Sequence, residues 1–185
     1  MENLTLRGRA WIFGDDVDTD VITPGQYMHL PAEELSQHVF EPIAPEFAGS
    51  FEAGGVLIAG SNFGCGSSRE TAPLALKHLG VAAVVAASFG RIFFRSAVAI
   101  GLPVLVCPGV ASQVEHGDEV EVDLGAARVV NRTRGGEISG APLHEMIVET
   151  LRRGGLMKLL ATGAAMPGAN EPRRGPATNG RGDGG

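Results

Sequence analysis

Short apolar runs alternate with helix-like segments along the first part of the chain. Four runs are bounded by glycine or proline and are short enough to be buried strands, at 4–13, 56–60, 81–87 and 102–107. The segments between them carry the end signals of helices, at 31–40, 69–79 and 91–100, with Gly80 and Gly101 where a glycine commonly ends a helix. This mixture of strands and helices predicts a domain of the α/β class.

The pattern changes towards the C-terminus. Residues 119–124 alternate polar and apolar side chains, which predicts a half-exposed strand, and residues 127–130 are expected to pair with it. Pro142 is expected to begin a last helix with apolar side chains on one face, and Gly154 with Gly155 to end it.

The composition changes again after residue 162. The final segment is rich in glycine, proline and small polar residues and has almost no bulky apolar side chains. Such a segment buries too little surface to offset the entropy lost on ordering. We therefore expect one folded domain over residues 1–162 and a disordered C-terminal tail over residues 163–185.

Composition also argues against several classes of protein. The 21 acidic residues exceed the 15 basic ones, and the net charge of −6 disfavours binding to nucleic acid or to an anionic membrane. There is no apolar run of about eighteen residues, and the N-terminal segment lacks the layout of a secretion signal. Cys65 and Cys107 are too few for a disulfide framework, which favours a cytoplasmic protein.

The densest group of chemically active residues is the segment Gly60-Ser-Asn-Phe-Gly-Cys-Gly-Ser-Ser-Arg-Glu70. It follows an apolar strand and leads into a helix, where unpaired backbone N–H groups and the positive end of the helix dipole favour an anion. Its glycines permit backbone conformations and close approaches that a side chain would block. Ser67, Ser68 and Arg69 add two hydroxyls and a planar guanidinium that suits a carboxylate.

Two other interpretations fit parts of this segment. Ser67 and Glu70 have the spacing of a capping box, and because a capping residue can also face a ligand, spacing alone does not separate the two roles. The pattern Gly64-x-Gly66-x-x-Arg69 is close to a dinucleotide-binding fingerprint, but the third glycine is missing. The acidic residue that this fingerprint requires about 20 positions later is also missing, so we reject a dinucleotide site.

The acidic segment Asp15-Asp-Val-Asp-Thr-Asp20 is the other unusual feature. Its alternate aspartates mimic the start of a calcium-binding loop, but Val21 stands where that loop requires glycine and Tyr27 where it requires glutamate. Two interpretations remain, a solvated turn or a turn that holds one aspartate in a site.

Other metal-binding patterns are weak. The histidines lie without ligand spacing, at His29, His38, His78, His116 and His144. The two cysteines cannot by themselves hold an iron–sulfur cluster, which needs about four thiolates.

Four segments in a fixed order carry a resemblance to a known family. They are Asp15-Asp-Val-Asp-Thr-Asp20-Val-Ile-x-Pro, Gly60-x-Asn-Phe-Gly-Cys-Gly-Ser-Ser-Arg-Glu70, Ala72-Pro-Leu-Ala-Leu-Lys77 and Ala87-Ser-Phe-Gly-Arg-Ile-Phe93. Together they resemble the small subunits of 3-isopropylmalate dehydratase, homoaconitase and related alkylmalate dehydratases, and the mobile C-terminal domain of aconitase. The similarity covers residues 7–160 and implies a three-layer β/β/α swivelling domain.

The resemblance also implies roles for the matching residues. Ser67 matches the catalytic base, Asp20 an active-site aspartate, and Arg69 an arginine that binds a substrate carboxylate. Gly66 and Ser68 belong to the same anion-binding turn. In the family a partner large subunit holds a [4Fe–4S] cluster, of which one iron is free of cysteine and acts as a Lewis acid on the substrate. This chain is expected to bind no metal itself.

The implied reaction is the isomerisation of a 2-hydroxy di- or tricarboxylate by dehydration and rehydration, as in leucine biosynthesis. In the family, the loop that corresponds to residues 26–31 reaches the distal group of the substrate. Met28 and Leu30 favour an alkyl group, whereas His29 can pair with a carboxylate. We therefore expect 3-isopropylmalate ahead of homocitrate or a methylated malate.

One interpretation of a different class stays open. The chain is then a non-catalytic module that has kept the fold and binds a carboxylate ligand or a partner. The presence of Ser67, Arg69 and Asp20 favours the enzyme.

Overall fold

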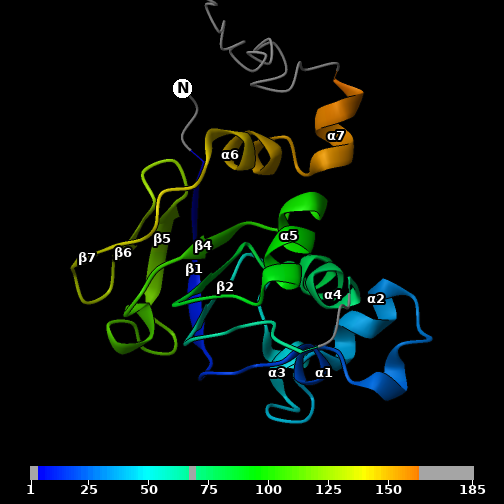
Figure 1. Ribbon diagram of the computed structural model, residues 1–185. Helices are drawn as coiled ribbons and strands as arrows, with labels where there is room; N and C mark the ends of the chain where they lie inside the picture. The colour runs from blue at the N-terminus through cyan, green and yellow to red at the C-terminus, as the bar shows by residue number, and fades with distance from the viewer. Residues whose placement is uncertain (1–3, 67–69, 163–185) are drawn as a thin grey trace, which may run out of the picture.

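A seven-stranded sheet forms the centre of the computed structural model, which describes residues 4–66 and 70–162. The strands are β1 (Thr5–Ile12), β2 (Val56–Ala59), β3 (Ala83–Ala86), β4 (Val104–Val106), β5 (Glu119–Asp123), β6 (Arg128–Asn131) and β7 (Glu137–Ser139). Their order is β4-β3-β2-β1-β5-β6-β7. The sheet has a parallel half, made of β1 to β4, and an antiparallel half, made of β1, β5, β6 and β7. Strand β1 belongs to both halves and joins them (Figure 1).

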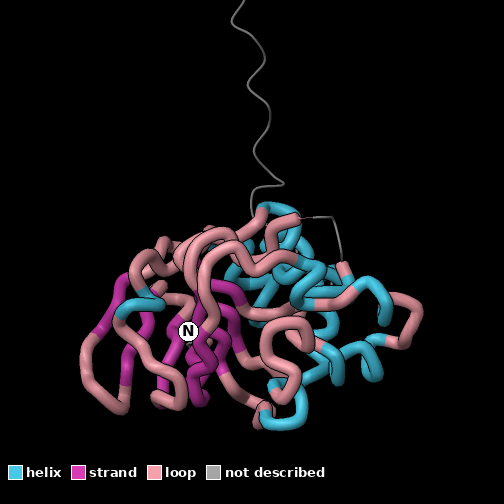
Figure 2. The backbone as a smooth tube through the Cα atoms, turned by 90° about the horizontal axis from the view of Figure 1, so that it is seen from below, coloured by secondary structure: helices cyan, strands magenta, loops and turns pink. Residues whose placement is uncertain are grey.

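The helices lie mainly on one side of the parallel half, and the strands of the antiparallel half lie on the other side (Figure 2). They are α1 (Thr19–Ile22), α2 (Ala32–Leu35), α3 (Phe47–Ser50), α4 (Thr71–Leu79), α5 (Arg91–Ile100), α6 (Glu145–Arg152) and α7 (Leu156–Ala161). Three short 3₁₀ helices are η1 (Gly25–Tyr27), η2 (Ser36–His38) and η3 (Val110–Ser112). In the described part of the chain no helix has the length and apolar character needed to cross a bilayer.

Strand β2 shows how the sheet comes to lie between two cores. All four of its side chains are buried, and successive side chains point to opposite faces. Leu57 and Ala59 belong to the core under the helices, whereas Val56 and Ile58 belong to the core shared with the antiparallel strands. The resulting layers are antiparallel strands, parallel strands and helices, so the β/β/α fold expected from the resemblance is confirmed.

Local signals predicted some helix ends correctly and others wrongly. Helix α5 has the predicted bounds, and Gly101 ends it with a left-handed φ of 76°. Helix α4 ends at Gly80 as predicted but begins at Thr71 rather than at residue 69. Glu70 stands at the cap position of α4 and makes no side-chain capping hydrogen bond there, and Ser67, the capping residue of the capping-box interpretation, lies outside the described residues.

Several elements differ from the prediction for the sequence. The helix expected over 31–40 is divided into α2 and η2 and ends at His38. The cause is Phe40, which adopts a φ of 59° and places its fully buried ring 4.2 Å from that of Phe13. The last predicted helix begins at Glu145 rather than at Pro142, and the short elements β7 and α7 were not predicted. The tail expected at 163–185 lies outside the described residues.

The prediction that residues 119–124 form a half-exposed strand is wrong. Strand β5 is buried on both faces, and the side chain of Glu121 is only 9% exposed. Two arginines from neighbouring segments cover its carboxylate: Arg7 Nε lies 2.6 Å and Arg132 Nη2 lies 2.8 Å from Glu121 Oε2. The hydrogen bond from Arg132, followed by that from Arg7, lowers the pKa of Glu121.

We expect acid to destabilise the protein partly through Glu121. Its pKa is lower in the folded state than in the unfolded state, so its stabilising effect is complete well above the unfolded pKa of about 4.3 and decreases as the pH falls through and below it. Glu121→Gln should therefore show a smaller loss of Tm between pH 7 and pH 3 than the native chain, measured by circular dichroism. Glu33→Gln, at an exposed position, should keep the native loss, and an equal loss in all three proteins would contradict the prediction.

Candidate active site

Loops that follow three parallel strands meet at one edge of the sheet. Residues 14–18 follow β1, residues 60–66 follow β2 and residues 87–90 follow β3. Because parallel strands end at the same edge, these loops come together at the lower edge of Figure 1, where α1 also lies. Three of the four segments that carry the family resemblance therefore lie at this edge. The fourth, residues 72–77, lies in α4, and α4 begins at the same edge.

The first two aspartates of the acidic segment bind the loop after β2. Asp15 Oδ1 accepts a hydrogen bond of 2.6 Å from the backbone N–H of Ser61, and Asp16 Oδ1 accepts one of 2.8 Å from the Asn62 amide. Asp16 and Asn62 have φ values of 54° and 62°, a left-handed conformation that these two residue types tolerate. Sequence reasoning missed these contacts, whose partners are 46 residues apart.

The third aspartate builds the start of α1 beside the glycine-rich loop. Asp18 Oδ1 accepts a hydrogen bond of 2.8 Å from the Val21 N–H and so caps the helix. The Thr19 N–H donates to the Cys65 carbonyl at 2.9 Å, which holds the helix against the loop. Asp20 is exposed in the first turn of α1 and directly follows Thr19, the residue that contacts this loop.

The loop glycines have the conformations that the sequence indicated. Gly64 and Gly66 have φ values of 73° and 94°, which side chains of L residues rarely adopt. A Cβ on Gly64 would lie 2.3 Å from Phe93 Cγ, whereas a Cβ on Gly66 would meet nothing closer than 3.5 Å, at Asp18 and Thr19. Gly64 is therefore required by packing as well as by conformation, and Gly66 exposes its backbone beside α1.

The loop after β3 supports the glycine-rich loop from the other side. Ser88 Oγ accepts a hydrogen bond of 2.8 Å from the Asn62 N–H, and the Gly90 N–H donates to the Phe63 carbonyl at 2.8 Å. The buried ring of Phe63 packs edge-on against Phe93, with ring centroids 5.2 Å apart. The segment 87–93 thus acts as a support for residues 60–66.

Helix α4 links the site to the rest of the helical layer. Its side chains Ala72, Ala75 and Leu76 are fully buried. Lys77 Nζ donates to the carbonyl of Ile100 at the C-terminal end of α5, and burial followed by the charge of Lys158 lowers the pKa of Lys77. The motif residues on α4 therefore have packing and helix-capping roles.

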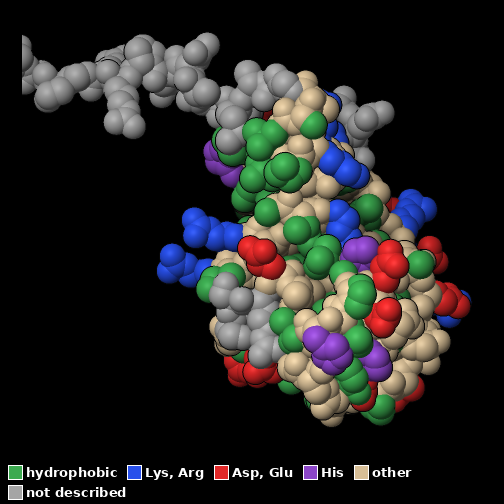
Figure 3. Space-filling view, turned by 90° about the vertical axis from the view of Figure 1, so that its right-hand side faces the viewer, with side chains coloured by type: hydrophobic (Ala, Val, Ile, Leu, Met, Phe, Trp, Pro, Cys, Tyr) green, Lys and Arg blue, Asp and Glu red, His purple; other side chains and the backbone are tan. Residues whose placement is uncertain are grey.

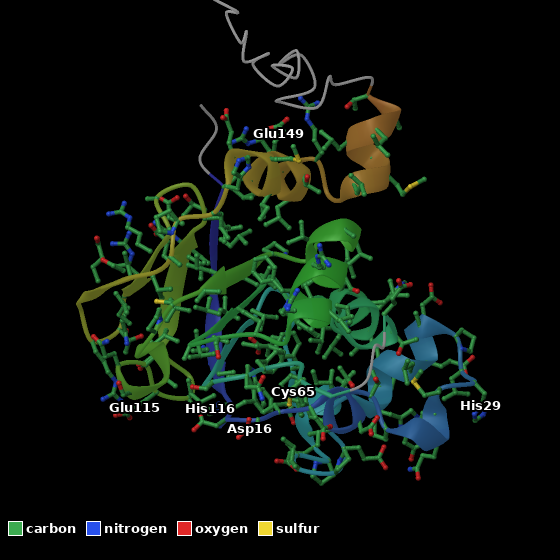
Figure 4. The ribbon with its side chains drawn as sticks, in the orientation of Figure 1. Asp16, His29, Cys65, Glu115, His116 and Glu149 are labelled. Atoms are coloured by element: carbon green, nitrogen blue, oxygen red, sulfur yellow. The ribbon has the colours of Figure 1, made fainter. Side chains whose placement is uncertain are left out.

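The segment 26–31 passes close to the start of α4. Thr71 Oγ1 lies 3.4 Å from Met28 Sδ, at the first residue of the helix and two positions after Arg69. Leu30 is half-buried and packs against the helical core. His29 is exposed and points outward, away from Cys65 and Asp16 (Figure 4).

Of the predicted site residues, the structure brings Asp20, Gly66 and Met28 to the same edge of the sheet. Ser67, Ser68 and Arg69 lie outside the described residues. Gly66, which precedes this gap, lies beside the start of α1, and Thr71, the second residue after the gap, lies beside Met28.

A cationic hollow adjoins the loop after β3. A cavity of about 440 Å³ is lined by Ser88, Phe89, Arg91, Phe94, Arg95 and Val106. Arg91 and Arg95 are exposed, and neither forms an ion pair with another described residue. These two guanidinium groups make the hollow itself locally positive, which favours an anion there.

The two thiols are in surroundings that keep them protonated. Burial raises the pKa of Cys107 to about 11, and burial followed by the charges of Asp18 and Asp16 raises the pKa of Cys65. Within the described ranges, no three histidine, cysteine or acidic side chains are grouped as metal ligands would be.

Comparison with known proteins identifies the class first. The family model described as the aconitase C-terminal domain matches residues 48–108. The crystal structure of 3-isopropylmalate dehydratase (leuD) from Methanocaldococcus jannaschii superposes with a TM-score of 0.81 at 39% identity, over 86% of this chain and 95% of that one. The fold is therefore that of an aconitase-type swivelling domain.

Curated relatives narrow the class to a family. The 3-isopropylmalate dehydratase small subunit 1 of Methanopyrus kandleri is 50% identical over 84% of this chain and 92% of its own length. The small subunit 2 of Archaeoglobus fulgidus is 53% identical over 83% and 93%, and the methanogen homoaconitase small subunit of Methanothermobacter thermautotrophicus is 48% identical over 82% and 88%. The chain belongs to the family of 3-isopropylmalate dehydratase small subunits, as its four motifs predicted.

Proposed function

We propose that the chain is the small subunit of a cytoplasmic hydro-lyase that isomerises 3-isopropylmalate by dehydration and rehydration, and that it is active only with a large subunit. The observation that carries this proposal is the meeting of separate motifs at one edge. The Thr19–Cys65 hydrogen bond holds α1 against the glycine-rich loop, and the Thr71–Met28 contact brings residues 26–31 to the start of α4. Asp20 thus lies next to the loop that ends in Gly66, and Met28 lies next to the start of α4, on either side in sequence of the segment that contains Ser67 and Arg69.

In this proposal the residues of the chain bind the substrate and move its proton. Arg69, with Ser68 and the Gly66 backbone, holds a substrate carboxylate, and Arg91 adds to the positive field. Ser67 removes the proton next to that carboxylate. A serine can act as a base where nearby cations, oriented backbone N–H groups and exclusion of water stabilise its anion. Asp20, in the first turn of α1, is assigned a hydrogen bond with the substrate in this proposal.

The [4Fe–4S] cluster of the family is assigned in this proposal to the large subunit. The residues of this chain do not suit the group, because its two cysteines have raised thiol pKa values and a cluster requires about four thiolates. When bound to the large subunit, the cluster supplies Lewis-acid chemistry at the substrate hydroxyl.

The contact of Met28 with Thr71 supports an alkyl substrate. A thioether offers an apolar surface to an isopropyl group and no charge for an additional carboxylate. We expect Met28→Arg to lower kcat/KM for 3-isopropylmalate about 10- to 100-fold and to lower it less, or to raise it, for homocitrate. Steady-state assays of the reconstituted pair with both acids provide the measurement.

Gln26→Arg is the matched control for this substitution, because it adds the same charge at an exposed position two residues away. It should leave the ratio of kcat/KM between the two acids close to the native value. Equal effects of the two arginines on this ratio would contradict a specific role for Met28.

Homoaconitase activity is the second candidate function. A methanogen homoaconitase small subunit is 48% identical to this chain, and His29 offers a partner for the additional carboxylate of homocitrate. A non-catalytic carboxylate-binding module is the alternative from another class.

The test is anaerobic co-expression with the candidate large subunit, followed by assay of alkene formation. The acids to compare are 3-isopropylmalate, homocitrate, citrate and 2,3-dimethylmalate. Turnover of 3-isopropylmalate that disappears when either chain is omitted supports the proposal, and preference for homocitrate supports the second candidate. A stable complex with an intact cluster and no turnover of any of these acids would overturn both.

A further inference from the structure

Three side chains outside the catalytic segment form a closed triangle around Tyr27. The rings of Tyr27 and His38 stack with centroids 3.8 Å apart and planes inclined by 14°. The Tyr27 hydroxyl donates a hydrogen bond of 2.9 Å to Glu41 Oε1, and His38 Nδ1 lies 2.7 Å from Glu41 Oε2. Each member of the Tyr27–His38–Glu41 triangle therefore contacts the other two.

The triangle joins the substrate loop to a firmly packed segment. Tyr27 directly precedes Met28, and its carbonyl accepts a hydrogen bond of 3.0 Å from the Leu30 N–H, so it belongs to the loop itself. On the other side, His38 and Glu41 flank Val39 and Phe40, which are 1% and 0% exposed. His38 and Glu41 thus connect the loop to the buried core.

The ionised carboxylate of Glu41 favours its hydrogen bonds with both Tyr27 and His38. Hydrogen bonds from His38 and then from Tyr27 lower the pKa of Glu41, so at neutral pH it is an ionised acceptor for both partners. The side chains of His38 and Glu41 are 33% and 38% exposed, on the face that carries α2, where histidine and acidic side chains lie side by side (Figure 3). Interactions this exposed contribute little to global stability, so their loss should act mainly on the local geometry of the loop.

We propose that Tyr27, His38 and Glu41 are positioning residues that hold Met28 against Thr71 and thereby set the selectivity of the enzyme for the distal group of its substrate. The proposal rests on the substrate role assigned above to residues 26–31. It assigns no contact with the substrate to the triangle. Misplacing a substrate-contacting side chain by a fraction of an ångström weakens binding without removing a reacting group.

The first test compares Tyr27→Phe, Glu41→Gln and the double variant in the reconstituted enzyme. Tyr27→Phe keeps the stacked ring and removes one hydrogen bond, and Glu41→Gln keeps the size and removes the charge. We expect each single variant to raise KM for 3-isopropylmalate about 3- to 10-fold with kcat changed less than about 2-fold, and to reduce the preference for this acid over homocitrate. The double variant should resemble the single ones, because the three groups act as a unit.

Glu149→Gln provides the matched control. Glu149 also accepts hydrogen bonds from two neighbouring side chains, Arg152 at 2.6 Å and Arg153 at 2.7 Å. It lies on α6, at the edge of the molecule opposite Cys65 and Asp16 (Figure 4). The control should keep the native KM and the native preference between the two acids.

Hydrogen exchange of the small subunit supplies a second readout that does not depend on turnover. Backbone amides of residues 25–30 should exchange faster in the triangle variants than in the native chain or in Glu149→Gln, while those of β2 and β3 stay unchanged. Native KM and selectivity in the triangle variants, with or without faster exchange, would overturn the proposal. Absence of turnover in the native pair would instead overturn the proposed function, and exchange would then still decide whether the triangle holds the loop.

Discussion

Replacement of Ser67 by alanine is expected to lower kcat of the reconstituted enzyme about 10³-fold while the two subunits still assemble. Removing a general base from a proton-transfer step typically costs about 10² to 10⁴ in rate, and alanine leaves no group that can replace the serine oxygen. KM should change little, because Arg69 and the Gly66 backbone keep their hold on the carboxylate. The measurements are steady-state kinetics with 3-isopropylmalate and gel filtration of the complex.

Ser61→Ala is the control for this experiment. Ser61 is exposed in the same loop, and its hydrogen bonds with described residues, to Asp15 and Asp16, use its backbone N–H and carbonyl. Its substitution should leave kcat within about 2-fold of native, since surface changes of this kind are usually small. Native turnover in Ser67→Ala would refute the assignment of the base and would favour the binding-module alternative.

The second large effect is expected from Gly90→Ala, at a position outside the catalytic segment. A Cβ at Gly90 would lie 2.5 Å from the Gly64 carbonyl oxygen and 3.1 Å from Cys65 Cα, and both are backbone atoms that no change of rotamer can move. Gly90 has an ordinary φ of −60°, so the cost is purely steric. We expect a loss of about 3 kcal/mol in the free energy of unfolding, at the upper end for overpacking, or about 10 °C in Tm.

The same substitution should lower kcat/KM, because the displaced loop contains Gly66, which directly precedes the catalytic residues Ser67 to Arg69. A misplacement of about 1 Å can reduce the rate about 10²-fold. Gly14→Ala is the matched control: Gly14 lies at the same edge of the sheet, and a Cβ there would meet no atom within 4 Å. Thermal denaturation and kinetics of both variants distinguish a steric clash at Gly90 from a general effect of adding a methyl group. Equal Tm values for Gly90→Ala and Gly14→Ala would contradict the prediction.

The acidic segment shows how far sequence reasoning could reach into the site. Val21 and Tyr27 at the sixth and twelfth positions excluded a calcium loop, but the residues alone left a solvated turn and a functional turn open. In the structure Asp15 and Asp16 form hydrogen bonds with the loop after β2, 46 residues away, and Asp18 caps α1. These three aspartates therefore fix the position of the helix that contains Asp20. Hydrogen bonds between segments so distant in the chain leave no periodic signal in the sequence.

The Tyr27–His38–Glu41 triangle was beyond sequence reasoning for a similar reason. His38 was one of five scattered histidines, and nothing in the spacing of residues 27, 38 and 41 indicates contact. The predicted helix over 31–40 would also have carried Phe40 along a regular spiral. Its left-handed turn into the aromatic core is what brings Glu41 back towards Tyr27.

The sequence by itself determined the features that depend on neighbouring residues. Apolar runs located β1 to β4, glycines located the ends of α4 and α5, and the order of four motifs identified the family. Tertiary structure alone decided which loops meet, which acidic side chains are buried and where helices are interrupted. The physical reason is range: propensities and caps act over a few residues, whereas the contacts of Asp15, Phe40 and Glu121 depend on chain segments that only folding brings together.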